Sequence, residues 1–197
     1  MEENTVKRYD AIKQIVESLN NELVVCNLGA PSRELYDIDD REENFYMLGS
    51  MGLVSSIAFG LAISKPNKRV VCIDGDGSLL MNLGSLSTIA NNSPNNLTLI
   101  VIDNSSYGST GDQKTYTSGK TKLEVIAKGA GFESITIIDK EKDIIQSLKN
   151  LGTGCHFVLI RTQPGNAHVS NIPLHPEEIK TRFCKAMLNF RHLKKKI

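Results

Sequence analysis

Short runs of consecutive apolar residues recur along the chain, and they constrain its fold more than any other feature. Strands buried on both faces have such continuous runs, whereas half-exposed strands alternate apolar with polar residues. The clearest runs are LVVCN (23–27), RVVCID (69–74), LTLIVI (97–102) and CHFVLI (155–160), and shorter ones are FYML (45–48) and ITII (135–138).

Between these runs, apolar residues recur at helical spacing. The expected helices cover 5–19, a turn opened by Pro31, 51–63, the segment from Leu79 to Ala90, residues near 140–150 and the segment after Pro176. Alternating strands and helices form right-handed βαβ units around a mostly parallel sheet. We therefore predict an α/β fold, a doubly wound, mostly parallel sheet of about six strands with helices on both faces, and a single domain over residues 1–197.

The composition argues against several classes of protein. The 197 residues are 40% hydrophobic and carry 23 basic and 22 acidic side chains, a net charge of +1. This balance favours neither a disordered chain nor a general nucleic-acid-binding protein. No apolar run reaches the roughly 18 residues of a membrane span, and the polar start MEENTVKRYD lacks the apolar core of a signal peptide. We expect a cytoplasmic protein that binds neither nucleic acid nor membrane.

Cysteines and charged segments are expected to be structural. The four cysteines form no CxxC pair, so they are expected to be reduced thiols, three of them in buried strands. They are Cys26, Cys72, Cys155 and Cys184. The acidic segment ELYDIDDREE (34–43) and the basic tail that starts at Arg191 are expected to be solvated surface.

The loop after the strand at 69–74 has the sequence GDGS and is the first candidate site. In a sheet of this kind, ligands bind beyond the carboxyl ends of the strands. Gly75 and Gly77 allow a tight turn, and Ser78 can cap the following helix, whose N–H groups would face an anion. Asp76 would repel a bare anion but suits a cation such as Mg²⁺ held between carboxylate and phosphate. A plain strand–turn–helix connection explains GDGS alone equally well.

The next strand, at 97–102, leads into a long polar loop at the same edge of the sheet. Asn104 offers an amide oxygen and a turn offers a backbone carbonyl, so with Asp76 they would give Mg²⁺ three oxygen ligands. The loop from 103 to about 120 is rich in Gly, Ser and Thr. Loops of this length in compact domains are usually functional or mobile, and a charged ligand could order this one.

GDGS followed by Asn104 resembles the cofactor motif of the thiamine-diphosphate enzymes, in which GDG is followed further along the chain by NN. Asp103 stands at the first Asn of that motif, and the second Asn, which binds the metal in the family, is present as Asn104. The resemblance implies that Asp76, Asn104 and the carbonyl of Ser106 bind Mg²⁺. It also implies that the GDGS loop holds the diphosphate of thiamine diphosphate.

The turn GSMG at 49–52 strengthens this resemblance. In the family, such a turn presents a carbonyl to the aminopyrimidine ring, here that of Gly49, and an apolar residue that bends the cofactor, here Met51. Without the other motifs, Met51 would be assigned to the core. The residues implied in cofactor binding are Gly49, Ser50, Met51, Gly75, Asp76, Gly77, Ser78, Asn104, Ser106, Tyr107 and Gly108.

Two further segments resemble the β subunits of sulfopyruvate decarboxylases, namely YGSTGDQKT (107–115) and QPGNAHVSNIPLHPEEIKTRF (163–183). The resemblance implies decarboxylation of 3-sulfopyruvate to sulfoacetaldehyde and CO₂, a step of coenzyme M biosynthesis. The chain has room for the diphosphate-binding domain only. The resemblance therefore implies a hetero-oligomer, in which a separate α subunit supplies the pyrimidine-binding domain and its catalytic Glu.

A small anionic 2-oxo acid substrate requires hydrogen-bond donors. The candidates in the two segments are Ser109, Thr110, Gln113, Lys114, Asn166 and His168. As catalytic candidates, Lys114 offers a point charge, Gln113 an amide donor and His168 a proton near neutral pH. For each of them, an ordinary role as a loop side chain remains open.

Three other functions remain open. A phosphonopyruvate decarboxylase has the same mechanism and shares a related STG-x-Q loop. A subunit of another split 2-oxo-acid enzyme, such as an oxidoreductase, usually carries iron–sulfur cysteines, which four scattered cysteines do not resemble. A non-catalytic module that binds the cofactor and regulates a partner is an alternative of a different class.

Overall fold

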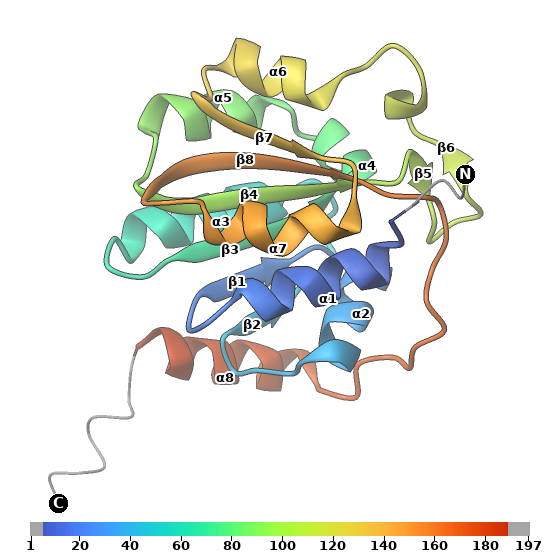
Figure 1. Cartoon of the computed structure of the whole chain (residues 1–197). Coiled ribbons are helices and arrows are strands. Elements are labelled where there is room, and N and C mark those ends of the chain that lie inside the picture. Colours follow the sequence, from blue (N-terminus) through green and yellow to red (C-terminus); the bar gives the residue numbers. More distant parts are fainter. Residues whose placement is uncertain (1–5, 189–197) are drawn as a thin grey trace, which may run out of the picture.

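The computed structural model describes residues 6–188 and contains a six-stranded parallel sheet (Figure 1). Its strand order is β2-β1-β3-β4-β8-β7, and all neighbouring strands are parallel. The strands are β1 (Leu23–Cys26), β2 (Asn44–Tyr46), β3 (Val70–Gly75), β4 (Asn96–Asp103), β7 (Ser134–Ile138) and β8 (Gly154–Arg161). The predicted doubly wound α/β class is confirmed.

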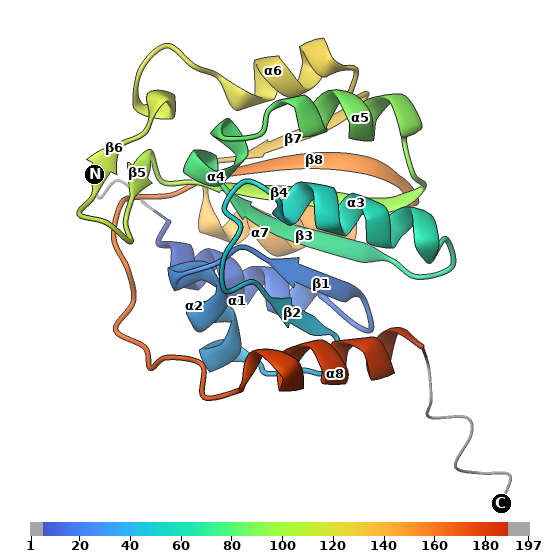
Figure 2. The same cartoon turned by 180° about the vertical axis from the view of Figure 1, so that it is seen from behind.

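Helices cover both faces of this sheet (Figures 1 and 2). One face is covered by α1 (Arg8–Ser18), α2 (Ala30–Ile38) and α7 (Ile144–Lys149), and the other by α3 (Val54–Ser64), α5 (Gly84–Asn92) and α6 (Leu123–Ala130). Helix α8 (Pro176–Met187) lies beside the edge strand β2 and sends Ile179 into one layer of the core and Phe183 into the other.

The continuous apolar runs are explained by this layered core. In β1, Leu23 and Val25 point into the layer under α3, whereas Val24 and Cys26 point into the layer under α1. All four side chains are at most 1% exposed. A strand that is covered on both faces has no position for a polar residue, which is why the alternation typical of half-exposed strands is missing.

The structure departs from the predicted elements in four places. The helix expected from Leu79 to Ala90 is two helices, α4 (Asp76–Leu80) and α5, joined by tight i→i+3 turns at 81–83. Its apolar spacing continues across the break, so periodicity could not reveal it. Helix α6 was not predicted, and β2 is shorter than the run at 45–48. The loop after β4 contains a small hairpin, β5 (Ser106–Tyr107) and β6 (Gln113–Lys114), followed by the 3₁₀ helix η1 (Tyr116–Ser118).

The prediction of solvated surface for residues 34–43 is wrong for Glu34, which is fully buried on α2 and paired with Arg8. The guanidinium of Arg8 beside it compensates the free-energy cost of burying this carboxylate. The basic tail from Arg191 lies outside the described residues. All four cysteine thiols are free, as expected. Among the helices at residues 6–188, none has the length and apolar character to cross a membrane.

Candidate active site

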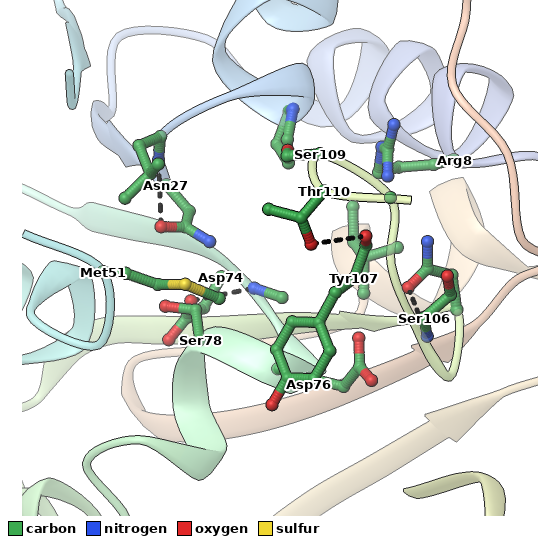
Figure 3. A pocket seen from close by; sticks show the side chains of 17 residues that line it. Arg8, Asn27, Met51, Asp74, Asp76, Ser78, Ser106, Tyr107, Ser109 and Thr110 are labelled. Atoms are coloured by element: carbon green, nitrogen blue, oxygen red, sulfur yellow. Dashed lines mark hydrogen bonds between the residues drawn. The ribbon is translucent and has the colours of Figure 1, made fainter. Parts of the chain in front are cut away.

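The carboxyl ends of β1, β3 and β4 surround a cavity of about 180 Å³ (Figure 3). The predicted cofactor residues that line it are Met51, Gly75, Asp76, Gly77, Ser78, Asn104, Ser106, Tyr107 and Gly108. Gly49 and Ser50 line a neighbouring hollow instead. The fold thus brings GDGS, Met51 and the β5–β6 hairpin together at the edge of the sheet where ligands of such folds bind.

The turn at 49–52 is attached to GDGS by hydrogen bonds. The Gly52 N–H donates to Ser78 Oγ at 3.0 Å, and Asn82 Nδ2 donates to the Gly52 carbonyl at 3.0 Å. Gly52 has φ +89°, a conformation that favours glycine. The prediction that Ser78 caps a helix is wrong, because α4 begins two residues earlier, at Asp76, and has no side-chain cap. Ser78 instead fixes the turn that positions Met51.

Asp76 is 2% exposed and lies among hydroxyl groups. Thr115 Oγ1 donates to Asp76 Oδ2, and Thr117 Oγ1 lies 3.1 Å from the same oxygen and 2.8 Å from Asp103 Oδ1. One hydroxyl hydrogen can serve only one of these carboxylates at a time. Burial raises the pKa of Asp76 to about 6, although the Thr115 hydrogen bond opposes the shift. A cation bound beside Asp76 would compensate the negative charge of these buried carboxylates.

Asp74, at the end of β3, also lines the cavity and is 1% exposed. Its Oδ1 accepts the Gly75 N–H at 2.8 Å, but its Oδ2 has no hydrogen-bond partner among the described residues. Burial raises the pKa of Asp74 to about 7, although the neighbouring Ser78 hydroxyl and the Gly75 N–H oppose the shift. A buried carboxyl oxygen without a partner is unusual in a folded protein. It indicates that a ligand group completes this end of the cavity.

The residues present fit the expected metal ion. Asn104 Oδ1 accepts the Ser106 N–H at 3.2 Å and has a second lone pair for a metal ion, while the buried Nδ2, a donor that does not bind cations, has no partner within residues 6–188. The carbonyls on either side of Ser106 accept N–H groups within the hairpin, so the Ser106 carbonyl points away from β6. One carboxylate and two neutral oxygens are a partial ligand set for Mg²⁺ that cofactor phosphates would complete.

Tyr107 connects the hairpin to GDGS. Its ring lies directly over Gly77, and a Cβ atom at position 77 would overlap the Tyr107 ring. In Figure 3 the ring is drawn beside the Asp76 side chain. Gly77 is therefore required for the close approach of the two cofactor segments.

Comparisons with known proteins decide the family. The family model described as thiamine pyrophosphate enzyme, C-terminal TPP binding domain, matches residues 32–162. Sulfopyruvate decarboxylase subunit beta of Methanocaldococcus jannaschii is 51% identical over 185 residues, which cover 92% of this chain and 97% of that protein. The chain belongs to the sulfopyruvate decarboxylase β-subunit family.

Other members of the wider group are longer. Sulfopyruvate decarboxylase of Methanosarcina acetivorans is 43% identical over 91% of this chain and 47% of its own length. Phosphonopyruvate decarboxylase of Streptomyces hygroscopicus is 37% identical over 81% of this chain and 40% of its own length. The solved thiamine diphosphate-dependent 4-hydroxybenzoylformate decarboxylase of Rhodococcus jostii shares the fold, with a TM-score of 0.70 and 16% identity over 83% of this chain and 34% of that one.

The substrate-binding candidates of this β-subunit family member do not all reach the cavity. Ser109 and Thr110 line it. Gln113 and Lys114 are exposed on β6, and Gln113 Nε2 donates back to the Thr110 carbonyl at 3.1 Å. His168 and Asn166 line a second hollow, between the start of α1 and segment 163–168. Catalytic roles for Gln113, Lys114 and His168 remain predictions.

Several residues around the cavity were not predicted from the sequence. They are Arg8, Asn27, Asp74, Thr115 and Thr117. Asn27 and Asp74 lie at carboxyl ends of strands, so the rule for ligand sites in such sheets could have found them. The sequence gives no such signal for Arg8, because it lies on a helix and its partner Glu34 is 26 residues away.

Proposed function

We propose that this chain is the β subunit of a thiamine-diphosphate- and Mg²⁺-dependent decarboxylase that converts 3-sulfopyruvate to sulfoacetaldehyde and CO₂. The observation that carries this proposal is the match, along nearly the whole of both chains, to a protein named sulfopyruvate decarboxylase subunit beta. The cavity supports it, because the two cofactor motifs meet there.

In this proposal, Mg²⁺ is held by Asp76, Asn104 and the carbonyl of Ser106. Within residues 6–188 there is no group of three or more His, Cys, Asp or Glu side chains suited to a metal ion. Because only one of the three ligands is charged, the ion depends on phosphate oxygens and binds together with the cofactor. Gly77 and Ser78 lie beside this site and would contact the diphosphate.

When bound, thiamine diphosphate supplies the electron sink for decarboxylation of a 2-oxo acid. The residues of this chain bind and orient the cofactor and the substrate. Met51 offers an apolar surface to the cofactor rings, held in place by the bond between Gly52 and Ser78. The Tyr107 ring packs against Gly77 of the GDGS loop. Ser109 and Thr110 place hydroxyl donors in the same cavity, where an anionic substrate group could bind.

The proposal includes an α-type partner that supplies the pyrimidine-binding domain and the catalytic Glu. Leu48, Leu53 and Ile57 are 57%, 45% and 39% exposed, and they flank the cofactor turn at 49–52. Large exposed apolar residues that gather beside a ligand site are typical of a protein interface. The name "subunit beta" of the M. jannaschii relative and the greater length of the M. acetivorans relative agree with a second unit in this position.

The test is reconstitution. The chain is mixed with the α-type subunit of the same organism, thiamine diphosphate and Mg²⁺, and aldehyde and CO₂ release from 3-sulfopyruvate are measured. We expect turnover only in the complete mixture. Full activity of the isolated chain would contradict a shared active site, and cofactor binding without any turnover would contradict the substrate.

Phosphonopyruvate is the second candidate substrate, because the S. hygroscopicus relative acts on it by name and is 37% identical to this chain. The same mixture is assayed with both 2-oxo acids. A larger kcat/KM for phosphonopyruvate than for 3-sulfopyruvate would replace the proposed substrate while keeping the cofactor.

A further inference from the structure

Arg8, on the first turn of α1, is held rigidly beside the cavity. Its Nε donates to Glu34 Oε2 and its Nη2 to Glu34 Oε1, both at 2.8 Å. Arg8 is 7% exposed and Glu34 is fully buried. A two-point contact of this kind fixes the plane of the guanidinium as well as its position.

A second contact ties Arg8 to the hairpin that lines the cavity. Arg8 Nη2 also donates to Asn166 Oδ1 at 2.7 Å, and Asn166 Nδ2 donates to the Gly108 carbonyl at 2.8 Å. The Ala167 N–H donates to Glu34 Oε1 at 3.0 Å. The guanidinium is therefore connected to α2, to segment 163–168 and to the loop after β5.

These contacts leave one nitrogen of Arg8 unused. A guanidinium has five N–H donors, and Nε and Nη2 provide the three that are bonded here. Nη1 has no acceptor among the described residues, although Arg8 lines the cavity together with Ser109 and Thr110 (Figure 3). Nη1 is not among the buried atoms that lack a partner, so it is open to the cavity, where a ligand can accept its hydrogen bonds.

The surroundings of Arg8 favour an anion over a cation. Ser109 Oγ lies close to the start of α2, since a Cβ atom at Gly29 would be 3.0 Å from it. The backbone N–H groups at the start of α2, which has no side-chain cap, carry positive partial charge. Glu34 neutralises the formal charge of Arg8 and its two oxygens already accept three N–H groups, so the binding capacity that remains is hydrogen-bond donation.

We propose that Arg8 binds a tetrahedral oxyanion in this cavity through its free Nη1. This inference rests on the proposed function, which offers two such groups, the sulfonate of the substrate and the terminal phosphate of thiamine diphosphate. If the anion is the sulfonate, Arg8 has the substrate-binding role that the sequence suggested for Lys114, which does not line this cavity.

The experiment measures binding by calorimetry, to the chain with its α-type subunit and to the chain alone. The probes are thiamine diphosphate with Mg²⁺, and sulfoacetate, a sulfonate that cannot be decarboxylated by this chemistry. Arg8→Lys keeps the charge beside Glu34 but removes Nη1. We expect it to weaken the binding of one probe roughly tenfold or more, as the loss of a hydrogen bond to a charged group does.

The two probes identify the source of the oxyanion. Weaker binding of sulfoacetate assigns Arg8 to the substrate sulfonate, and weaker binding of thiamine diphosphate assigns it to the cofactor phosphate; both support the proposal. A change below about fivefold for both probes overturns it, given the size of one such hydrogen bond. Arg33→Lys is the matched control, because Arg33 lies on α2 outside the cavity lining and bonds to Asn171.

Asn166→Ala separates binding from positioning. It breaks the connection from Arg8 to Gly108 and leaves the contact between Arg8 and Glu34 intact. If it weakens the same probe as much as Arg8→Lys does, Arg8 acts only by placing the loop, and the proposal is overturned. If Arg8→Lys does not fold, the ¹⁵N resonances of the wild-type Arg8 guanidinium decide. A shift on addition of either probe supports the proposal, and no shift overturns it.

Failure of the proposed function gives a different result. A wild-type complex that binds thiamine diphosphate but releases no CO₂ from 3-sulfopyruvate refutes the proposed substrate. Calorimetry measures binding and not turnover. The effect of Arg8→Lys therefore tests the role of Arg8 independently of the proposed substrate.

Discussion

The two ends of the cavity handle buried charge in opposite ways. At the GDGS end, Asp74 and Asp76 are buried without a basic partner in the described residues 6–188, and burial raises the pKa of both. At the other end, Arg8 and Glu34 neutralise each other, and a single guanidinium nitrogen is left without an acceptor. In the proposed function a cation completes the first end, whereas the second is already a complete structural unit with one free donor group.

This difference separates residues that serve the ligand from residues that serve the fold. Uncompensated carboxylates lower the stability of the protein alone, so their presence indicates a ligand. A buried charge pair is compatible with the folded state only while both partners remain. Removal of one partner therefore destabilises the fold before it affects a ligand. Substitutions at the two ends should therefore affect different measurements.

Asp76→Asn should produce the largest effect, and on function only. It removes the single charged ligand of the proposed Mg²⁺ site, so we expect Mg²⁺-dependent cofactor affinity and turnover to fall more than about 100-fold, beyond the loss typical of residues that only support a metal ligand. The melting temperature of the cofactor-free chain should not fall, because a destabilising buried charge has been removed. Calorimetry and thermal unfolding measure the two effects.

Asp139→Asn is the control for this substitution, because Asp139 is an exposed carboxylate whose side chain is 60% accessible. It should change neither measurement. Equal cofactor affinity in Asp76→Asn and the wild type would show that the GDGS end does not hold the metal.

Glu34→Gln should affect stability most strongly. It leaves the buried Arg8 charge without a counter-ion, which costs about 3–5 kcal/mol in the free energy of unfolding. The matched change is Glu124→Gln, since Glu124 also pairs with an arginine at 2.8 Å but the side chain of that partner, Arg161, is 43% exposed. This control should cost less than about 1 kcal/mol. Urea unfolding compares the two, and equal losses would mean that the Arg8 end is not a charge-dependent structural unit.

The pH dependence of stability should reveal Asp74 in the metal-free and cofactor-free chain. Burial raises the pKa of Asp74 to about 7, above its ordinary value of 3.8. Both folded and unfolded chains bind this proton below about pH 4, but between about pH 4 and 7 only the folded chain retains it. Stability is therefore highest at the acid end of this window and falls as the pH rises, by up to about 4 kcal/mol for a difference of this size.

Asp74→Asn should remove most of this fall, since an amide does not titrate. Urea unfolding at a series of pH values from 4.5 to 7.5 provides the measurement. As a control, the wild type and Asp139→Asn should give roughly parallel curves of stability against pH. An identical slope in Asp74→Asn and the wild type would show that Asp74 is ionised in the folded chain and has a partner.

The sequence predicted the GDGS end of the cavity far better than the Arg8 end, for a physical reason. Strand runs and their carboxyl-terminal loops are local patterns, so the sheet and the place of Asp76 and Asn104 at its edge could be predicted from them, and the motif resemblance added the cofactor role. Arg8 and Glu34 meet only because α1 packs against α2, and Asn166 joins them from far along the chain. No local pattern encodes such a contact.

The same limit applies to the elements that were missed or misplaced. Ser78 was expected to cap a helix, but α4 already begins at Asp76, and the Ser78 hydroxyl accepts the Gly52 N–H instead. Glu34 was expected on the surface because acidic neighbours surround it, although its position on α2 faces the core. In both cases the tertiary contact, and not the local composition, decides the result.

Gly77→Ala should give the smallest of these effects and tests the contact that joins the two ends. The added Cβ would overlap the Tyr107 ring, so the hairpin must shift, at a cost of about 1–3 kcal/mol. Gly129→Ala, in α6 with no atom within 4 Å of the new Cβ, should instead stabilise the chain by about 0.5–1 kcal/mol. If Tyr107→Leu is added to Gly77→Ala, the smaller side chain should relieve the overlap, and the combined cost should be less than the sum of the two separate costs. Simple additivity would mean that Tyr107 does not press on GDGS, and the two ends of the cavity would then be independent.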